Sequence, residues 1–251
     1  MDSPSISIII PILNAEKTIA DCLASILRQS FSNFEVLVQD GGSVDKSIQQ
    51  IKDIASGDDR FRLFQFTDSG VYDAMNRILP FAQGQWVLFL GADDALYDKD
   101  VLKCFSEMVP AKSQVVYGNV EIVGKVQWAS NPLKYDGRFN LKKLLKRNIC
   151  HQSIFYSTQL LGSLNGVYNT RYFMMADWDL NLKLWAREPF HYIDFTVAKF
   201  KAGGISSSAK VDVAFKNDFI YNLYDYFGIS IVLKYSISVI HNWFNNKFKR
   251  K

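Results

Sequence analysis

Residues 85–94 read QWVLFLGADD, and this stretch sets the prediction for the whole chain. Trp86 to Leu90 form a short, continuous apolar run that is typical of a strand buried on both faces. The run ends at Gly91, and Asp93 and Asp94 follow at once. Ligands of open α/β sheets bind beyond the carboxyl ends of the strands, where a carboxylate pair suits a divalent cation on a phosphate. Taken alone the pair is better explained as a solvated turn, so the prediction depends on what else converges there.

Three further predicted strands precede this one: Ser5 to Leu13, Phe34 to Gln39, and Arg60 to Phe66. Apolar residues at helical spacing separate them, which predicts right-handed crossovers and an α/β fold with a mostly parallel sheet and helices on both faces. A lone Asp after a strand is often only a helix cap. Several polar strand ends on one edge instead suit a nucleotide-sugar, whose base, ribose and phosphates need different loops. Here those residues are Asn14, Asp40, Asp68, Asp93 and Asp94.

The alternation of strands and helices weakens after Asp94. Residues 115–128 predict an antiparallel pair around Gly124, and residues 149–156 predict a strand that carries His151. His151 is equally consistent with a satisfied core histidine and with a functional one. Residues 174–185 predict a helix whose first turn holds Asp177 and Asp179. Such acids either interact with the helix dipole or point into a cleft as a general base.

The composition is ordinary for a globular protein: of 251 residues, 48% are hydrophobic and 22% charged, with a net charge of +4. Nucleic-acid binding is poorly supported, because the basic residues do not follow an aromatic-studded groove. Three widely spaced cysteines favour reduced thiols in a reducing cytosol. The N-terminus shows no signal-peptide pattern, and no apolar run is long enough to span a bilayer. We therefore expect a cytoplasmic protein.

Composition also divides the chain into a domain of residues 1–217 and a tail of residues 218–251. The tail is rich in aromatic, aliphatic and basic residues and ends in a cluster of positive charge at 247–251. One interpretation is a helical appendage packed back on the domain. The other is an amphipathic helix that lies on the inner face of the cytoplasmic membrane, where anionic lipid attracts its basic residues.

The order and spacing of four motifs resemble the inverting family 2 glycosyltransferases of GT-A fold, above all the bacterial members that build surface polysaccharides such as O-antigen or capsule. The motifs reach from Ser5 to about Gly204, and the first two are the more specific. They are SISIIIPILNAEKTIADCLASILRQSFSNFEVLVQDGGSVDKS, DSGVYDAMNRILPFAQGQWVLFLGADD, ICHQSIFY and ADWDLNLKLW.

The resemblance implies a role for each matching residue. Asp94 is the direct ligand of Mg or Mn and Asp93 lies nearer the ribose, although Gly91 takes the position where the family's motif often has its first Asp. Asp177 is the catalytic base, with Asp179 as the alternative. The residues expected around the nucleotide-sugar are Asn14, Asp40 at the base (usually uracil), Asp68, Asp73, Asn76 and Arg77, with His151 and Gln152 near the donor phosphates or the acceptor.

The implied activity is a metal-dependent hexosyl or N-acetylhexosaminyl transfer with inversion. The donor is a nucleotide-sugar, expected to be a UDP-sugar, and the acceptor is a hydroxyl of a glycan or of a polyprenyl-diphosphate-linked oligosaccharide. One alternative is a degenerate nucleotide-sugar-binding or scaffolding subunit of a polysaccharide assembly complex, which Gly91 and Ala176 favour and the presence of Asp94 and Asp177 disfavours. A nucleotidyltransferase would want a glycine-rich, basic phosphate loop near the N-terminus, and PILNAEKT is not one.

Overall fold

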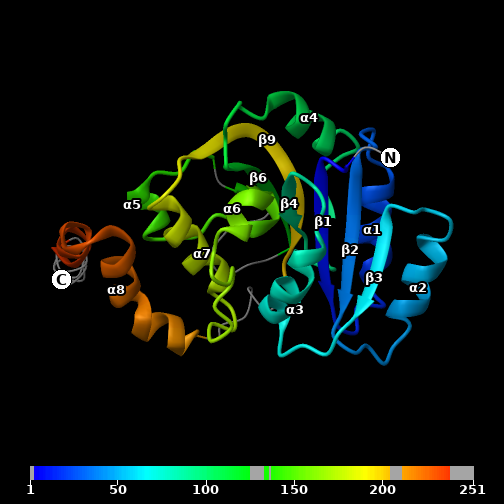
Figure 1. Cartoon of the computed structure of the whole chain (residues 1–251), viewed down its shortest axis with the longest axis horizontal. Helices are drawn as coiled ribbons and strands as arrows, with labels where there is room; N and C mark the ends of the chain where they lie inside the picture. Colours follow the sequence, from blue (N-terminus) through cyan, green and yellow to red (C-terminus); the bar gives the residue numbers. More distant parts are fainter. Residues whose placement is uncertain (1–2, 125–132, 136, 204–210, 238–251) are drawn as a thin grey trace.

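A twisted sheet of nine strands forms the centre of the protein (Figure 1). The computed structural model describes residues 3–124, 133–135, 137–203 and 211–237. The strand order is β3-β2-β1-β4-β8-β6-β9-β5, with β7 paired to β6. The strands are β1 (Ile6–Ile12), β2 (Phe34–Asp40), β3 (Phe61–Gln65), β4 (Trp86–Phe89), β5 (Ala95–Leu96), β6 (Val115–Val123), β7 (Leu133–Tyr135), β8 (Ile154–Ser157) and β9 (Phe190–Lys201).

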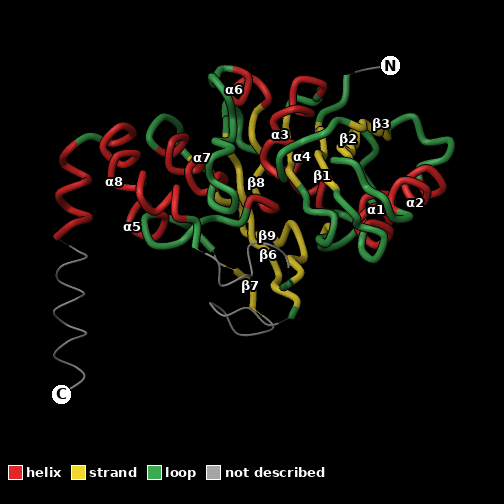
Figure 2. The backbone as a smooth tube through the Cα atoms, turned by 90° about the horizontal axis from the view of Figure 1, so that it is seen from below, coloured by secondary structure: helices red, strands yellow, loops and turns green. Residues whose placement is uncertain are grey.

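The first four strands in the order are mutually parallel, as their alternation with helices predicts. Helix α3 (Val71–Ile78) packs on β1 and β2, and α1 (Ile19–Leu27) packs against α2 (Ser47–Ile54), as Figure 2 shows; α1 also contacts β5. Every residue of β1 and β2 is buried, because both strands lie inside the sheet and are covered on both faces. The predicted α/β fold is therefore confirmed, and the carboxyl ends of these strands meet at one edge.

After β4 the strand pairing is no longer purely parallel. β8 pairs antiparallel with both β4 and β6, and β9 is parallel to β6 but antiparallel to β5. Helices α4 (Val101–Met108), α5 (Leu141–Leu144), α6 (Thr158–Gly162) and α7 (Ala176–Trp185) belong to this half. Its elements come from segments far apart in sequence, which is why the strand–helix pattern weakens there.

The structure revises one sequence prediction in this half, and a second falls outside the described residues. His151, predicted to lie in a strand, is in a short 3-10 helix, η2 (His151–Ser153), because the backbone N–H and the hydroxyl of Ser153 both donate to the carbonyl of Cys150. The second strand predicted after Gly124 falls on residues 125–128, which lie outside the described residues. The described partner of β6 on that side is β7.

The predicted boundary at residue 218 falls inside a helix, and the division into domain and tail stays a prediction. Helix α8 (Val213–Phe227) starts after Asp212, whose carboxylate caps it by accepting from the backbone N–H of Phe215 at 3.1 Å. Gly228, with a φ of 76°, ends this helix, and residues 229–237 are helical again. Within the ranges that the structure describes, every helix is too short or too polar to cross a membrane.

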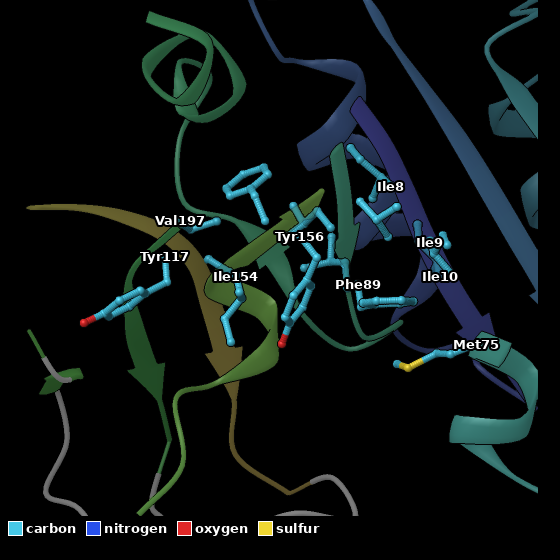
Figure 3. Close-up of a cluster of buried hydrophobic side chains, with 14 of the residues drawn as sticks. Ile8, Ile9, Ile10, Met75, Phe89, Tyr117, Ile154, Tyr156 and Val197 are labelled. Carbon is cyan, nitrogen blue, oxygen red and sulfur yellow. The ribbon is translucent and has the colours of Figure 1, made fainter. Parts of the chain in front are cut away.

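The hydrophobic core runs continuously beneath the strand ends (Figure 3). Phe89 of β4 lies between the isoleucines of β1, Met75 of α3 and Tyr156 of β8. The ring centroids of Phe89 and Tyr156 are 6.2 Å apart. Because interiors are packed as densely as organic crystals, this core holds the loops that follow β1 and β4 in fixed relative positions.

Candidate active site

A cavity of about 790 Å³ opens at the carboxyl ends of β1 and β4. Its wall combines the loop after β1, the start of α3, the turn after β4, η2 and the residues before α7. This is the position at which open α/β sheets bind ligands. Six of the residues predicted from sequence line it: Asn14, Asp68, Asp93, Asp94, His151 and Gln152.

Asp94 lies at the floor of this cavity and is only 3% exposed. Its Oδ2 accepts from the side chain of Gln152 at 2.8 Å, and its Oδ1 accepts from the backbone N–H of Lys201 at 3.0 Å. Burial, followed by the negative charge of Asp93, raises the pKa of the Asp94 carboxyl to about 7. The turn after β4 therefore holds the carboxylates of Asp93 and Asp94 close together at a site that is partly shielded from water.

Gly91 lets the two carboxylates fold back over the turn. A Cβ at this position would lie 2.6 Å from Asp94 Oδ2 and 2.9 Å from Asp93 Oδ1, closer than real Cβ contacts. The position at which the resembling family often has an acid is thus filled here by the carboxylates of Asp93 and Asp94 themselves. Hard oxygen donors that repel one another fit a divalent cation, because a cation between them would relieve the repulsion. Among the described residues, no cluster of three or more acidic, histidine or cysteine side chains is arranged to bind a metal, so other ligands would come from nucleotide and water.

Asp40 and Asp68 lie on neighbouring strand ends. Asp40 is 1% exposed, and its carboxylate accepts from the backbone N–H groups of Gly42 and Ser43 at 3.0–3.2 Å. It is not among the described residues that line the cavity. Asp68 Oδ1 accepts from Gly70, whereas its buried Oδ2 has no hydrogen-bond partner among the described residues. That unpartnered oxygen is available to a ligand donor, because a buried acceptor without a partner is costly.

Asn14 connects the first strand end to the next loop. It adopts a positive φ of 52°, and its Oδ1 accepts from the backbone N–H of Val44 at 2.9 Å. Its own N–H donates to Ser43 Oγ at 2.8 Å. Asn tolerates this left-handed backbone conformation better than most residues. Asn14 therefore fixes the shape of the loop that carries Asp40's partners.

The three predicted residues on α3 are engaged within the protein. Asp73 pairs with Arg77 at 3.0 Å and accepts from the backbone N–H of Ser69. Asn76 donates to the carbonyl of Tyr168 and accepts from its N–H. None of the three is among the described residues that line the cavity. These contacts hold α3 in place. A contact of the three residues with the donor stays a prediction.

Asp177 stands behind the cavity wall, 9% exposed, in the first turn of α7. Its Oδ1 is contacted by the hydroxyl of Tyr72 at 3.1 Å and by the backbone N–H of Trp178 at 2.8 Å. Its Oδ2 accepts from Asn148 at 2.9 Å and lies 3.4 Å from Nδ1 of His151. Tyr72 and His151 both line the cavity, so Asp177 is separated from it by its own hydrogen-bond partners.

The sequence did not predict a role at the site for Tyr72 or Asn148. Burial, followed by the charge of Asp177, raises the pKa of Tyr72 well above its usual range, so its hydroxyl stays a donor. Asn148 is oriented by a buried chain in which Tyr156 donates to Asn181 and Asn181 donates to Asn148, at 2.7 and 2.8 Å. Tyr72 lies inside a motif that the sequence already highlighted, but nothing in the sequence marks Asn148 as a partner of a residue 29 positions away.

Asp179, the alternative base, faces the opposite way. It accepts from Asn222 at 2.9 Å and Tyr226 at 3.0 Å, both on α8. Burial raises its pKa to about 6. The structure thus brings Asp177 next to the cavity and places Asp179 in the packing between α7 and α8.

The profile of the family described as Glycosyl transferase family 2 matches residues 7–164, well over half of the chain. The chain belongs to glycosyltransferase family 2. A PGL/p-HBAD biosynthesis glycosyltransferase of Mycobacterium tuberculosis is 40% identical to this glycosyltransferase over 221 residues, which are 86% of the chain and 84% of the relative. The resemblance inferred from the motifs is therefore confirmed.

Two further proteins resemble this family 2 glycosyltransferase. The UDP-Glc:alpha-D-GlcNAc-diphosphoundecaprenol beta-1,3-glucosyltransferase WfgD of Escherichia coli is 32% identical over 134 residues, 49% of this chain and 48% of that protein. The crystal structure of S. aureus TarS 1–349 in complex with UDP-GlcNAc superposes with a TM-score of 0.71 at 20% identity, covering 89% of this chain and 67% of that one. The TarS likeness confirms the fold, which is of GT-A type.

Proposed function

We propose that this glycosyltransferase moves a hexosyl or N-acetylhexosaminyl group from a UDP-sugar to a hydroxyl of a lipid-linked glycan, with inversion at the anomeric carbon. The observation that carries the proposal is the cavity beyond β1 and β4. It holds Asp93 and Asp94 at its floor, and the carboxylate of Asp177 lies directly behind its wall.

On the donor side, Asp94 and Asp93 would hold a Mg or Mn ion, which supplies charge stabilisation for the departing diphosphate. Gln152 and the backbone N–H of Lys201 orient the Asp94 carboxylate. The unpartnered Oδ2 of Asp68 and the buried Asp40 support a site for the base and ribose at the neighbouring strand ends. For Asp40 to bind the donor there, the backbone N–H groups of Gly42 and Ser43 must release the carboxylate oxygens that they now occupy.

On the acceptor side, Asp177 would take the proton of the attacking hydroxyl. A positioned general base contributes about 10²–10⁴-fold to such a reaction. Catalytic hydrogen bonds are often incomplete before substrates bind, so the acceptor hydroxyl would replace the contact of Tyr72 or His151 with this carboxylate. Direct displacement would need Asp177 on the acceptor side of the sugar and the acidic turn after β4 on the side of the departing diphosphate.

The relatives support the substrate classes. The name of WfgD describes a UDP-glucose donor and an alpha-D-GlcNAc-diphosphoundecaprenol acceptor, and TarS was crystallised with UDP-GlcNAc. The M. tuberculosis relative is named for biosynthesis of PGL/p-HBAD. We extend these classes to this chain: a uridine nucleotide-sugar and an acceptor anchored in lipid.

A lipid-anchored acceptor also favours contact with the inner face of the cytoplasmic membrane. Exposed apolar side chains are frequent in the C-terminal segment, and they include Tyr221 at 72%, Leu233 at 55% and Ile237 at 66% exposed. Such a face on an amphipathic helix suits an interfacial position.

The test compares Asp177→Asn with Asp179→Asn. Calorimetry measures binding of UDP and of UDP-sugars with Mn and then with chelator, and a transfer assay measures product and anomeric configuration. We expect Asp177→Asn to abolish transfer while UDP binding stays intact, and Asp179→Asn to retain most activity. Substantial transfer by Asp177→Asn would refute the assignment of the base. Metal-independent donor binding would refute the role of Asp94, and binding of UDP-sugars without transfer would favour a non-catalytic subunit.

A further inference from the structure

A second cavity, of about 1080 Å³, lies on the other side of the segment that precedes α7. We call it the basic groove; α5 and the turn after it, the start of α7, α8 and residues 229–237 line it. Its apolar lining includes Leu145, Trp178, Phe215, Phe219, Ile220 and Ile231. Apolar concave sites of this size accommodate hydrocarbon, because burying it releases ordered water.

Four lysines surround this apolar lining. They come from three separate segments: Lys142 and Lys146 from α5 and its end, Lys216 from α8, and Lys234 from the following helix. All four are exposed, and no ion pair is described for them within the described residues. Several like charges held around one apolar groove repel one another, and an anionic group between them relieves that repulsion.

Asp212 is the one acid among the described lining residues, so it offsets only part of the charge of the four lysines. Asp212 is 3% exposed and its carboxylate is occupied by backbone donors: Oδ2 accepts from Met174 and Met175 at 3.0 and 3.1 Å, and Oδ1 caps α8. The chemistry of the groove is therefore an apolar floor with a cationic rim, which matches a hydrocarbon chain that ends in phosphate.

The basic groove and the active-site cavity share a wall. Phe173 and Met174 line the active-site cavity, whereas Met175 and Trp178 line the groove, and Asp177 lies between them in the first turn of α7. A molecule anchored in the groove would thus end close to the proposed base.

We propose that the basic groove binds the lipid end of the acceptor: its phosphate groups at the lysine rim and the first part of its hydrocarbon chain on the apolar floor. The inference rests on the proposed transfer to a lipid-linked acceptor, and it adds where on this chain the lipid is recognised. The acceptor sugar then extends past Met174 and Met175 toward Asp177.

The first experiment is calorimetry with three probes, carried out with Mn and saturating UDP so that the donor cavity is already occupied and does not compete. The probes are farnesyl diphosphate, farnesol and inorganic diphosphate. We expect farnesyl diphosphate to bind at least about tenfold more tightly than either of the others, because only it uses both floor and rim. Equal binding of inorganic diphosphate would reduce the groove to an anion site and overturn the proposal. Binding of phosphatidylglycerol vesicles without binding of farnesyl diphosphate would make this face a membrane-docking surface and overturn it too.

Matched variants locate the effect. Lys142→Gln/Lys216→Gln should weaken farnesyl diphosphate by roughly 25-fold, about fivefold per lysine. Ile220→Glu places a carboxylate at a partly exposed position in the groove and should abolish binding of farnesyl diphosphate. Lys52→Gln/Lys103→Gln removes the same charge from α2 and α4 and should leave binding unchanged. An unchanged affinity in the groove variants would refute the assignment.

The outcome is separable from that of the proposed function. In the groove variants, UDP binding should stay at the wild-type value, and KM should rise for a lipid-linked acceptor but not for the same sugar without its lipid phosphate. Loss of UDP-sugar binding and transfer in the wild type would refute the proposed function. Normal transfer with an unchanged KM in the groove variants would refute only the inference drawn from the groove.

Discussion

Gly91 controls how the acidic turn after β4 is shaped. A methyl group at this position would meet Asp94 Oδ2 at 2.6 Å, and Asp94 cannot move without breaking its bonds to Gln152 and Lys201. We expect Gly91→Ala to lower transfer about tenfold or more, to weaken Mn-dependent UDP binding and to destabilise the fold by about 1–3 kcal/mol. Gly162→Ala is the control, since nothing lies within 4 Å of its added Cβ. Wild-type transfer by Gly91→Ala would show that the carboxylates need not fold back over the turn.

Tyr72 tests how the proposed base is held. Its hydroxyl lies 3.1 Å from Asp177 Oδ1 and 2.8 Å from the carbonyl of Met174. Tyr72→Phe should lower kcat about tenfold, because hydrogen bonds to charged groups contribute about 1.5–3 kcal/mol, and should leave UDP affinity unchanged. Steady-state kinetics and calorimetry measure the two effects. Tyr168→Phe removes a buried hydroxyl that has no partner in the described part of the chain and should have wild-type kcat; equal losses in both variants would contradict a role specific to Tyr72.

At the residue level, the sequence predicted the acids of the candidate site but not their hydrogen-bond partners. Asp94 and Asp177 follow from motif position alone, whereas Asn148 reaches Asp177 only through a chain of hydrogen bonds that starts at Tyr156. The direction of a carboxylate is likewise invisible: Asp177 and Asp179 are two positions apart, yet one contacts the cavity wall and the other contacts α8. Such orientations depend on tertiary packing, which local pattern does not encode.

At the level of elements, the stability that the contact between α7 and α8 contributes depends on pH. Burial raises the pKa of Asp179 from 3.8 to about 6, so the folded state binds its proton more tightly than the unfolded state does. Stability is therefore highest below the unfolded pKa and falls as pH rises through about 6, by roughly 2 kcal/mol between about pH 4.5 and 7.5. Asp179→Asn should lack this part of the fall in urea titrations at the two pH values. Parallel pH profiles for wild type and variant would contradict the assignment.

Elements with local patterns were predictable. β1, β2, β3 and β4 appear within a few residues of their predicted bounds, because apolar runs and helical spacing are local signals. η2 was predicted as strand, since its 3-10 turn depends on bonds from Ser153 to the carbonyl of Cys150. The grouping of Lys142 and Lys146 of the α5 region with Lys216 and Lys234 was not predictable from local pattern, because these lysines lie far apart along the chain.

At the scale of the whole molecule, Gly84 sets how closely β1 and the chain entering β4 approach. A Cβ there would lie 2.5 Å from the backbone N of Ser7 and 2.7 Å from the carbonyl carbon of Ile6. Because backbone atoms of a central buried strand cannot yield, Gly84→Ala should destabilise the protein by about 1–3 kcal/mol. Urea unfolding followed by circular dichroism measures this change, with Gly162→Ala again as the control. A midpoint within error of wild type would show that β1 adapts.

The change from parallel to antiparallel pairing at β4 and β8 also has an evolutionary consequence. The acidic turn and its strand-end neighbours come from one continuous stretch up to Asp94, whereas Asp177 and the basic groove come from segments after residue 140. The two portions meet through a few contacts, among them those of Gln152 and Lys201 with Asp94 and of Tyr72 with Asp177, so mutations away from these contacts can reshape one portion with little effect on the other. Relatives with this architecture can keep the same nucleotide-sugar donor while they differ in the acceptor that they glycosylate. Chimaeras joined between Asp94 and β6 should therefore have the donor specificity of their N-terminal parent and the acceptor specificity of their C-terminal parent.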